Sequence, residues 1–242
     1  MMSFFHTVLY VPIYNLLILL TDILPGGDIG LAVVVATILV KLLIMPLSLS
    51  ALRTQKVLKE IDPKLKELRE KYKEDKERQA KEMFALYKEH GINPFAGLAT
   101  LFIQLPILLT LFWVFQSKTL TVVDTSLLYP FVPAPEVISS LFLGTFEIAS
   151  ASITLAIVAA VLQFIQGYYG FPVPPKSETK GPPTMGQDFG RAMALQMRYL
   201  LPLFVGVGAF VTSNAIALYL ITSSAVAILQ ELYIRRKKKI EG

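Results

Sequence analysis

Long uncharged runs of apolar residues alternate along this chain with shorter charged segments. Three runs, residues 29–47, 94–116 and 148–169, have the length of about twenty residues that a helix needs to cross about 30 Å of hydrocarbon. A fourth run, residues 199–230, is too long for one crossing at about 1.5 Å of rise per residue. Folded back at Ser213 and Asn214, it makes two short helices. The pattern therefore predicts five crossings.

The basic residues favour this fold-back over a single long helix. Of the 23 Lys and Arg residues, 12 lie in residues 53–88, 4 in residues 176–198 and 5 in residues 235–239. Basic residues collect on the cytoplasmic side of membrane helices, and only the fold-back puts all three segments on one side. The N-terminus is then outside and the C-terminus in the cytoplasm. Lys41, inside the first crossing, and Lys118 are the exceptions.

The N-terminal residues 4–24 are apolar but have neither a basic leading segment nor a small-residue cleavage site, so a cleaved signal peptide is not expected. Polar pairs recur about every seven residues and mark a polar stripe on a helix; they are His6-Thr7, Tyr14-Asn15 and Thr21-Asp22. This pattern indicates a helix lying in the outer membrane interface. A sixth crossing is the alternative.

Residues 50–92 show a helical apolar repeat within a strongly charged segment. Spacings of three and four predict two amphipathic helices, with apolar stripes at Leu58, Ile61, Leu65, Leu68 and Tyr72, and at Met83, Phe84 and Tyr87. Polar residues 72–77 turn the chain, and Gly91 closes the second helix. Asp62-Pro63 either kinks the first helix or restarts it with Asp62 as N-cap. The alternative to a hairpin is a solvated charged loop.

Composition agrees with a membrane protein. Apolar residues make up 54% and charged residues 17% of the chain, and its mean hydropathy is +0.56, whereas soluble domains are about a quarter charged. The chain has no Cys and only two distant His residues, which argues against disulfides, a thiol nucleophile and a metal site. We therefore expect no cofactor, no metal and no enzymatic activity.

Several polar side chains fall inside the expected crossings. Lys41 lies near the middle of the first, where a charge costs about 2.5–3.5 kcal/mol on insertion scales. The other crossings offer Gln104, Gln163, Gln166, Asn214, Tyr219, Thr222 and Ser223. Each alone suits a hydrogen bond between helices, but together with Lys41 they predict a hydrated, positively charged groove open to the cytoplasm. Lys41 snorkelling to the cytoplasmic surface is the alternative.

The sequence divides accordingly into ten segments. They are an interfacial helix (1–28), the first crossing (29–49), a cytoplasmic hairpin (50–92), the second crossing (93–116), an extracytoplasmic loop (117–147), the third crossing (148–169), a cytoplasmic loop (170–198), the fourth (199–213) and fifth (214–232) crossings and a basic tail (233–242). The fold class is an all-α polytopic membrane protein. Its five-transmembrane-helix core has a hydrophilic groove.

Several stretches of the chain carry a family resemblance from about residue 25 onward. They are Ile38-Leu39-Val40-Lys41-Leu42-Leu43-Ile44-Met45-Pro46-Leu47, Asp62-Pro63-Lys64-Leu65-Lys66-Glu67-Leu68-Arg69, Ala85-Leu86-Tyr87-Lys88 before Gly91-Ile92-Asn93-Pro94, Leu101-Phe102-Ile103-Gln104-Leu105-Pro106-Ile107, Leu201-Pro202 and Leu218-Tyr219. With them the sequence resembles the YidC family of membrane protein insertases and its mitochondrial and chloroplast relatives.

The resemblance implies insertion of newly made proteins into the bacterial plasma membrane, through a groove open to cytoplasm and lipid. Its implied partners are nascent membrane proteins and the lipid bilayer, with the ribosome and the translocon as further candidates and no small-molecule substrate. The groove's basic residue, commonly Arg in the family, is Lys41 here, which keeps the charge without the planar fork of Arg. A small-solute transporter or channel is the rival reading, although the chain shows no internal repeat.

Overall fold

The computed structural model describes residues 6–91, 106–114, 123–170 and 195–241, most of them helical. These residues form two compact units, one of residues 1–43 with 107–242 and the other of residues 44–106. Within the first unit, three helical stretches are long and apolar enough to cross a membrane: His6–Ile23, Ile153–Gly170 and Asn214–Ile234. Ile29–Leu43 and Gln196–Val211 are apolar but shorter. The chain is therefore a mostly helical membrane protein.

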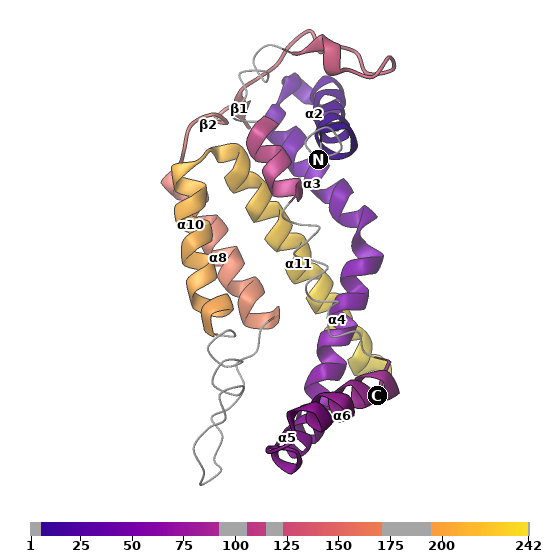
Figure 1. The fold of residues 1–242 in the computed structure, drawn as a ribbon. Coiled ribbons are helices and arrows are strands. Elements are labelled where there is room, and N and C mark those ends of the chain that lie inside the picture. The colour runs from indigo at the N-terminus through magenta and orange to yellow at the C-terminus, as the bar shows by residue number, and fades with distance from the viewer. Residues whose placement is uncertain (1–5, 92–105, 115–122, 171–194, 242) are drawn as a thin grey trace. The chain divides into compact units, whose positions relative to one another are not determined.

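Four of the described helices pack together as a bundle in the first unit (Figure 1). They are α3 (Ile29–Leu43), α8 (Ile153–Gly170), α10 (Leu201–Val211), which continues the π-helical η5 (Gln196–Leu200), and α11 (Asn214–Glu241). α8 packs against α10 and α11, and α11 packs against α3. Small residues permit this close packing, since a Cβ on Gly206 of α10 would lie 2.9 Å from the Ala160 Cβ of α8.

The long C-terminal run of apolar residues turns where its composition predicts. α10 ends at Val211 and α11 begins at Asn214, so the chain reverses around Ser213. One end of the bundle, at which α3, α8 and α11 begin, is called the loop end. The opposite end, where Arg198 and Arg236 lie, is called the basic end.

The first apolar helix is shorter than the expected crossing of residues 29–49. α3 stops at Leu43, and α4 (Met45–Glu60) begins after a turn at Ile44. Pro46 explains the break, because it has no N–H to donate to the carbonyl four residues earlier and its ring clashes with that carbonyl. Pro46 instead sits in the first turn of the new helix, where proline is favoured.

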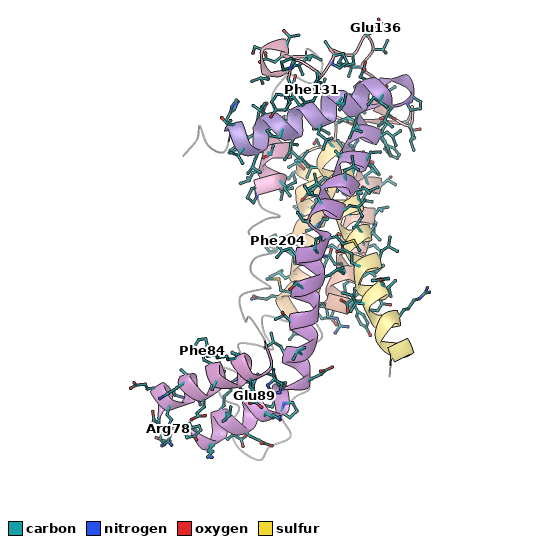
Figure 2. The ribbon with its side chains drawn as sticks, turned by 90° about the vertical axis from the view of Figure 1, so that its right-hand side faces the viewer. Arg78, Phe84, Glu89, Phe131, Glu136 and Phe204 are labelled. Carbon is teal, nitrogen blue, oxygen red and sulfur yellow. The ribbon has the colours of Figure 1, made fainter. Side chains whose placement is uncertain are left out.

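The N-terminal segment crosses the loop end of the bundle. It comprises η1 (His6–Tyr10), α2 (Val11–Ile23) and the turn η2 (Pro25–Gly27). Figure 1 views α2 nearly along its axis, whereas Figure 2 shows it lengthwise across the end of the bundle. Its polar stripe is turned inward only in part, since Asn15 and Thr21 are buried whereas His6-Thr7 and Asp22 are exposed. Packing against protein, rather than exposure to water, explains the buried members of the stripe.

Residues 123–152 cover the loop end and contain structure that the sequence analysis did not anticipate. A short 3₁₀ turn, η4 (Thr125–Leu127), is followed by two antiparallel strands, β1 (Leu141–Phe142) and β2 (Phe146–Glu147). The expected third crossing of residues 148–169 starts later, at Ile153. Residues 148–150 instead belong to the loop, because Ile148 N donates to Ser140 O at 2.8 Å and Ser150 O accepts from Asn214 N at 2.7 Å.

The second unit contains α4 and two amphipathic helices, α5 (Asp62–Lys71) and α6 (Lys76–Glu89). Ile61 and Leu65 are buried in a small cluster with Val57, Leu58, Met83, Leu86 and Tyr87. Of the alternatives for Asp62-Pro63, the structure has the restart, with Ile61 as the cap and Asp62 as the first helical residue. Phe84, expected in the apolar stripe, is instead 58% exposed, because it lies beside that stripe rather than within it (Figure 2).

Candidate functional site

Lys41 lies in the last turn of α3, on the face that packs against protein. It follows Thr37 by four residues and Val33 by eight, and both of these are buried. Residues four apart share a helix face. Lys41 itself is half-buried, whereas the next residues, Leu42 and Leu43, are exposed. The charged residue therefore lies on the inner face of α3 and the apolar residues after it point outward.

Three consecutive hydroxyl residues of α11, Thr222, Ser223 and Ser224, are buried. Ser224 Oγ donates a hydrogen bond to Gln163 Oε1 of α8 at 3.1 Å, which joins the two helices. Gln163 and Gln166 are half-buried and three residues apart, so they share one side of α8. Thus the structure brings Gln163 and the hydroxyls of α11 together, and Ser224 is a member that sequence reasoning missed.

A second row of polar side chains runs along α11 toward the basic end. Ser223 and Gln230 follow Tyr219 by four and eleven residues, spacings that put all three on one face of the helix. Gln230 is only 7% exposed, and its Nε2 has no hydrogen-bond partner among the residues that the structure describes. Sequence reasoning omitted Gln230 because it ends the uncharged run, although its spacing from Ser223 could have identified it.

Two charged residues at the basic end were not singled out from the sequence. Glu231 is buried near the end of the expected fifth crossing, in α11. Arg198, in η5, places its guanidinium Cζ 3.8 Å from the ring centroid of Tyr168 on α8. Its Nε also has no hydrogen-bond partner within the described ranges. The basic end therefore has a buried carboxyl side chain and a half-buried guanidinium.

Asn214, which the sequence analysis grouped with the groove, is held at the loop end. Its Nδ2 donates to Glu147 O at 2.7 Å and to Ser150 Oγ at 3.4 Å. Because it precedes Thr222 by eight residues, it lies roughly 12 Å away along the axis of α11. The structure thus separates Asn214 from the other candidates and gives it a part in fastening the loop.

Gln104, the remaining candidate, lies outside the described residues. The helix visible from that region covers residues 106–114 and buries Thr110, Leu111 and Val114. Within the described part of the chain, His, Asp and Glu residues form no group of three that could hold a metal ion. The candidate site therefore consists of uncharged polar side chains together with Lys41.

Comparison with known proteins places these residues in context. The sequence matches the family described as 60Kd inner membrane protein over residues 20–241. It is 27% identical over 211 residues to the membrane protein insertase YidC of Fusobacterium nucleatum, covering 87% of this chain and 88% of that protein. It is 28% identical over 214 residues to the membrane protein insertase YidC of Oceanobacillus iheyensis, covering 86% of this chain and 74% of that protein.

A shorter alignment has higher identity. The chain is 41% identical over 92 residues to the membrane protein insertase YidC of Cellvibrio japonicus, which corresponds to 38% of this chain and 17% of that protein. The similarity to insertases of this name therefore extends over most of the chain, and the identity is higher over a shorter part of it.

Proposed function

The chain belongs to the 60Kd inner membrane protein family and is a multi-pass membrane protein insertase; we propose that it guides the polar segment of a newly made membrane protein along the buried polar side chains of α3, α8 and α11. The client's apolar segment meanwhile slides against lipid. The process is physical rather than catalytic, because it lowers the cost of moving a polar segment across hydrocarbon and breaks no bond.

The membrane placement that we propose has five crossings. They are α3, the segment containing residues 106–114, α8, α10 and α11, with α2 along the outer interface. The direction of α2 across the bundle (Figure 2) and the segregation of 21 of the 23 basic residues into three segments support this placement. The N-terminus is then outside, and the C-terminal residues 233–242 contact anionic lipid or ribosomal RNA in the cytoplasm.

The position of Lys41 carries this proposal. A lysine that only snorkelled would suit a lipid-facing position, whereas Lys41 shares the inner face of α3 with buried Val33 and Thr37. α3 packs against α11, which carries Thr222 and Ser223. The charge of Lys41 can attract a carboxylate of the incoming chain, and hydroxyl groups of the helix packed against α3 can replace part of the hydration that the client loses.

The strength of this attraction suits a transient contact. A charge pair at about 4 Å is worth up to about 4 kcal/mol at an effective dielectric constant near 20, before the cost of desolvation. That energy biases entry of an acidic segment without holding the client permanently. The proposed path then consists of Lys41, Gln104, Gln163, Gln166, Tyr219, Thr222 and Ser223. We include Ser224 and Gln230 in it because both are buried on α11.

Reconstitution into vesicles tests this function. Purified protein should insert a single-span test protein with an acidic leading segment, and Lys41→Leu should slow that insertion while Lys41→Arg retains it. Leu42→Ala, a change at the exposed neighbour, controls for disturbance of the helix. Lys118→Leu, a change outside the three basic segments, controls for loss of a positive charge elsewhere. Equal insertion by Lys41→Leu and the unchanged protein would reject the role of Lys41. Solute flux without insertion would favour the transporter reading.

The second unit is proposed as a docking element for the ribosome, the translocon or the client. Its cluster around Ile61 and Leu65 is large enough to pair two helices but too small to form an independent domain core. Replacing residues 53–90 by a short linker should therefore leave a membrane-integrated protein with impaired insertion. Unimpaired insertion would contradict the docking role, and loss from the membrane would show that the unit stabilises the bundle.

A further inference from the structure

The connection between β1 and β2 carries a leucine in an unfavourable backbone conformation. Leu143 has φ +49° and is followed by Gly144 at φ +68°. Glycine adopts positive φ readily, but for leucine the left-handed region costs roughly 1–2 kcal/mol. Asn, Asp and Gly are the usual residues at such positions. Leu143 is also 67% exposed, so burial in the fold does not compensate for its conformation.

The hairpin holds this leucine in a fixed direction. Leu143 N donates to Asp28 Oδ2 at 2.8 Å, and the other oxygen of Asp28 accepts from Leu31 N at the start of α3. The neighbouring Phe142 packs over α3 at Gly30, where an added Cβ would come within 2.7 Å of Phe142 Cβ. Side chains alternate along a strand, so Leu141 of β1 faces away from the packed side of Phe142. Leu141 and the turn residue Leu143 are both exposed.

The exposed leucines are continuous in sequence with an exposed apolar face of the bundle. Five residues connect the end of β2 to the start of α8 at Ile153. The side chains of Ile153, Ile157 and Val161 on α8 are exposed. Figure 1 shows the two strands at the end of the bundle where α8 begins and α10 ends. A helix that crosses a membrane turns such a face toward lipid. The hairpin therefore lies at the end of the apolar surface that α8 presents.

We propose that the hairpin tip, Leu141 and Leu143, inserts into the lipid leaflet at the loop end and anchors residues 123–152 to the membrane surface. Transfer of two leucine side chains from water to the acyl boundary compensates for the strained conformation. Asp28 fixes the tip so that little additional ordering is needed on contact with lipid. This contact goes beyond the proposed insertion of clients, and it is independent of which leaflet the loop end faces.

Depth-dependent fluorescence quenching tests the proposal directly. The chain has no cysteine, so Leu143→Cys, Leu141→Cys and Glu136→Cys can each carry one environment-sensitive probe in phosphatidylcholine–phosphatidylglycerol vesicles. Probes at 143 and 141 should emit at shorter wavelength and be quenched several-fold more by shallow nitroxide lipids than the probe at Glu136, an exposed loop position (Figure 2). Aqueous iodide should show the reverse order.

A second variant separates lipid contact from a structural role. Leu143→Asn removes the apolar side chain but suits positive φ, so its melting temperature in detergent should be unchanged or higher while lipid quenching at position 141 falls. Equal iodide quenching at 143 and 136 would overturn the proposal. A lower melting temperature of Leu143→Asn in detergent would also overturn it. Lipid quenching that changes with the protein density in the vesicles would overturn it as well, because it would indicate contact with a second copy of the chain. Insertion activity enters none of these readouts, so failure of the proposed function would leave them unchanged.

Discussion

The two ends of the bundle use buried polar side chains in different ways. At the loop end, Asn15 of α2, Asp28 before α3 and Asn214 of α11 each hydrogen-bond the backbone of residues 123–152. At the basic end, Ser224 and Gln163 form a bond, but within the described residues Nε2 of Gln230 and Nε of Arg198 have no partner. The two ends therefore differ in their side-chain bonds to backbone: those at the loop end fasten residues 123–152.

Asn15 illustrates the loop end most clearly. Its Nδ2 donates to Leu127 O at 2.8 Å, and its Oδ1 accepts from Tyr129 N at 2.7 Å. Ser213 Oγ and Asn214 Oδ1 at the loop end have no hydrogen-bond partner among the described residues, so buried atoms without a partner occur at both ends. Even so, three separate helical segments converge on one loop. We interpret the loop end as the closed end of the molecule and the basic end as the end that receives the client.

The largest effect is expected from the charge of Lys41 on α3. Lys41→Glu should reverse the attraction for an acidic client segment, and Lys41→Leu should remove it. Loss of about 1.4 kcal/mol corresponds to about a tenfold lower rate, so both variants should insert acidic-segment clients about tenfold more slowly or worse. Insertion rates are measured in vesicles at equal protein content. A client whose leading segment is basic should not be slowed, and slowing of both clients alike would contradict an electrostatic role.

Loss of a loop-end hydrogen bond should instead lower stability. Asn15→Ala leaves Tyr129 N and Leu127 O without their side-chain partner, and a buried unsatisfied group costs about 1–3 kcal/mol. Thermal unfolding in detergent should therefore begin at a lower temperature. Insertion well below that temperature should be unchanged. A loss of insertion with unchanged stability would break the proposed division between the two ends.

Gly30→Ala tests the packing of the loop against α3. An added Cβ would meet Ile148 Cδ1 and Phe142 Cβ, both at 2.7 Å. Overpacking of this kind costs about 1–3 kcal/mol, toward the lower part of that range where side chains can shift. Gly208→Ala is the matched control, because nothing lies within 4 Å of a Cβ at that position. Equal melting temperatures of the two variants would contradict the close contact.

The smallest effect on stability is expected at Gln230. Replacing a buried amide that lacks a partner by an apolar side chain of similar size can be neutral or stabilising, so Gln230→Leu should not lower the melting temperature in detergent. Asn15→Leu, the same kind of change at the loop end, should lower it. The sign of this difference, measured under identical conditions, tests whether the two buried amides have different roles. A clear destabilisation by Gln230→Leu would show that Gln230 is structural.

The sequence was informative where one physical constraint dominates. Hydrocarbon thickness and the distribution of basic residues favour a break near Ser213, and α11 begins at Asn214. Helical spacing also predicts the pairing of Ile61 and Leu65 with Met83 and Tyr87. In these two cases, the pattern of apolar residues along the chain and the packing of the helices require the same structure.

The sequence was less informative where residues distant along the chain meet. The stripe containing Tyr14 and Asn15 has the spacing of a water-facing row, but the residues that bind it, such as Asp124 and Tyr129, lie more than a hundred positions away. The two-residue strands are too short for a detectable alternation. For Asn214 and Gln230, the residue type indicates only an amide side chain. The tertiary contacts show that Asn214 fastens the loop, whereas Gln230 is left as a candidate for the client path.

Crosslinking to a stalled client is the most direct test of that path. A photoreactive amino acid is placed at Ser223 or at Asn214 with Lys41 intact, and ribosomes stalled on an acidic-segment client are supplied to vesicles. The account predicts strong adducts from position 223, weak adducts from position 214, and loss of the adduct from position 223 in Lys41→Leu. Equal adducts from both positions, or an adduct from position 223 that Lys41→Leu leaves unchanged, would contradict it.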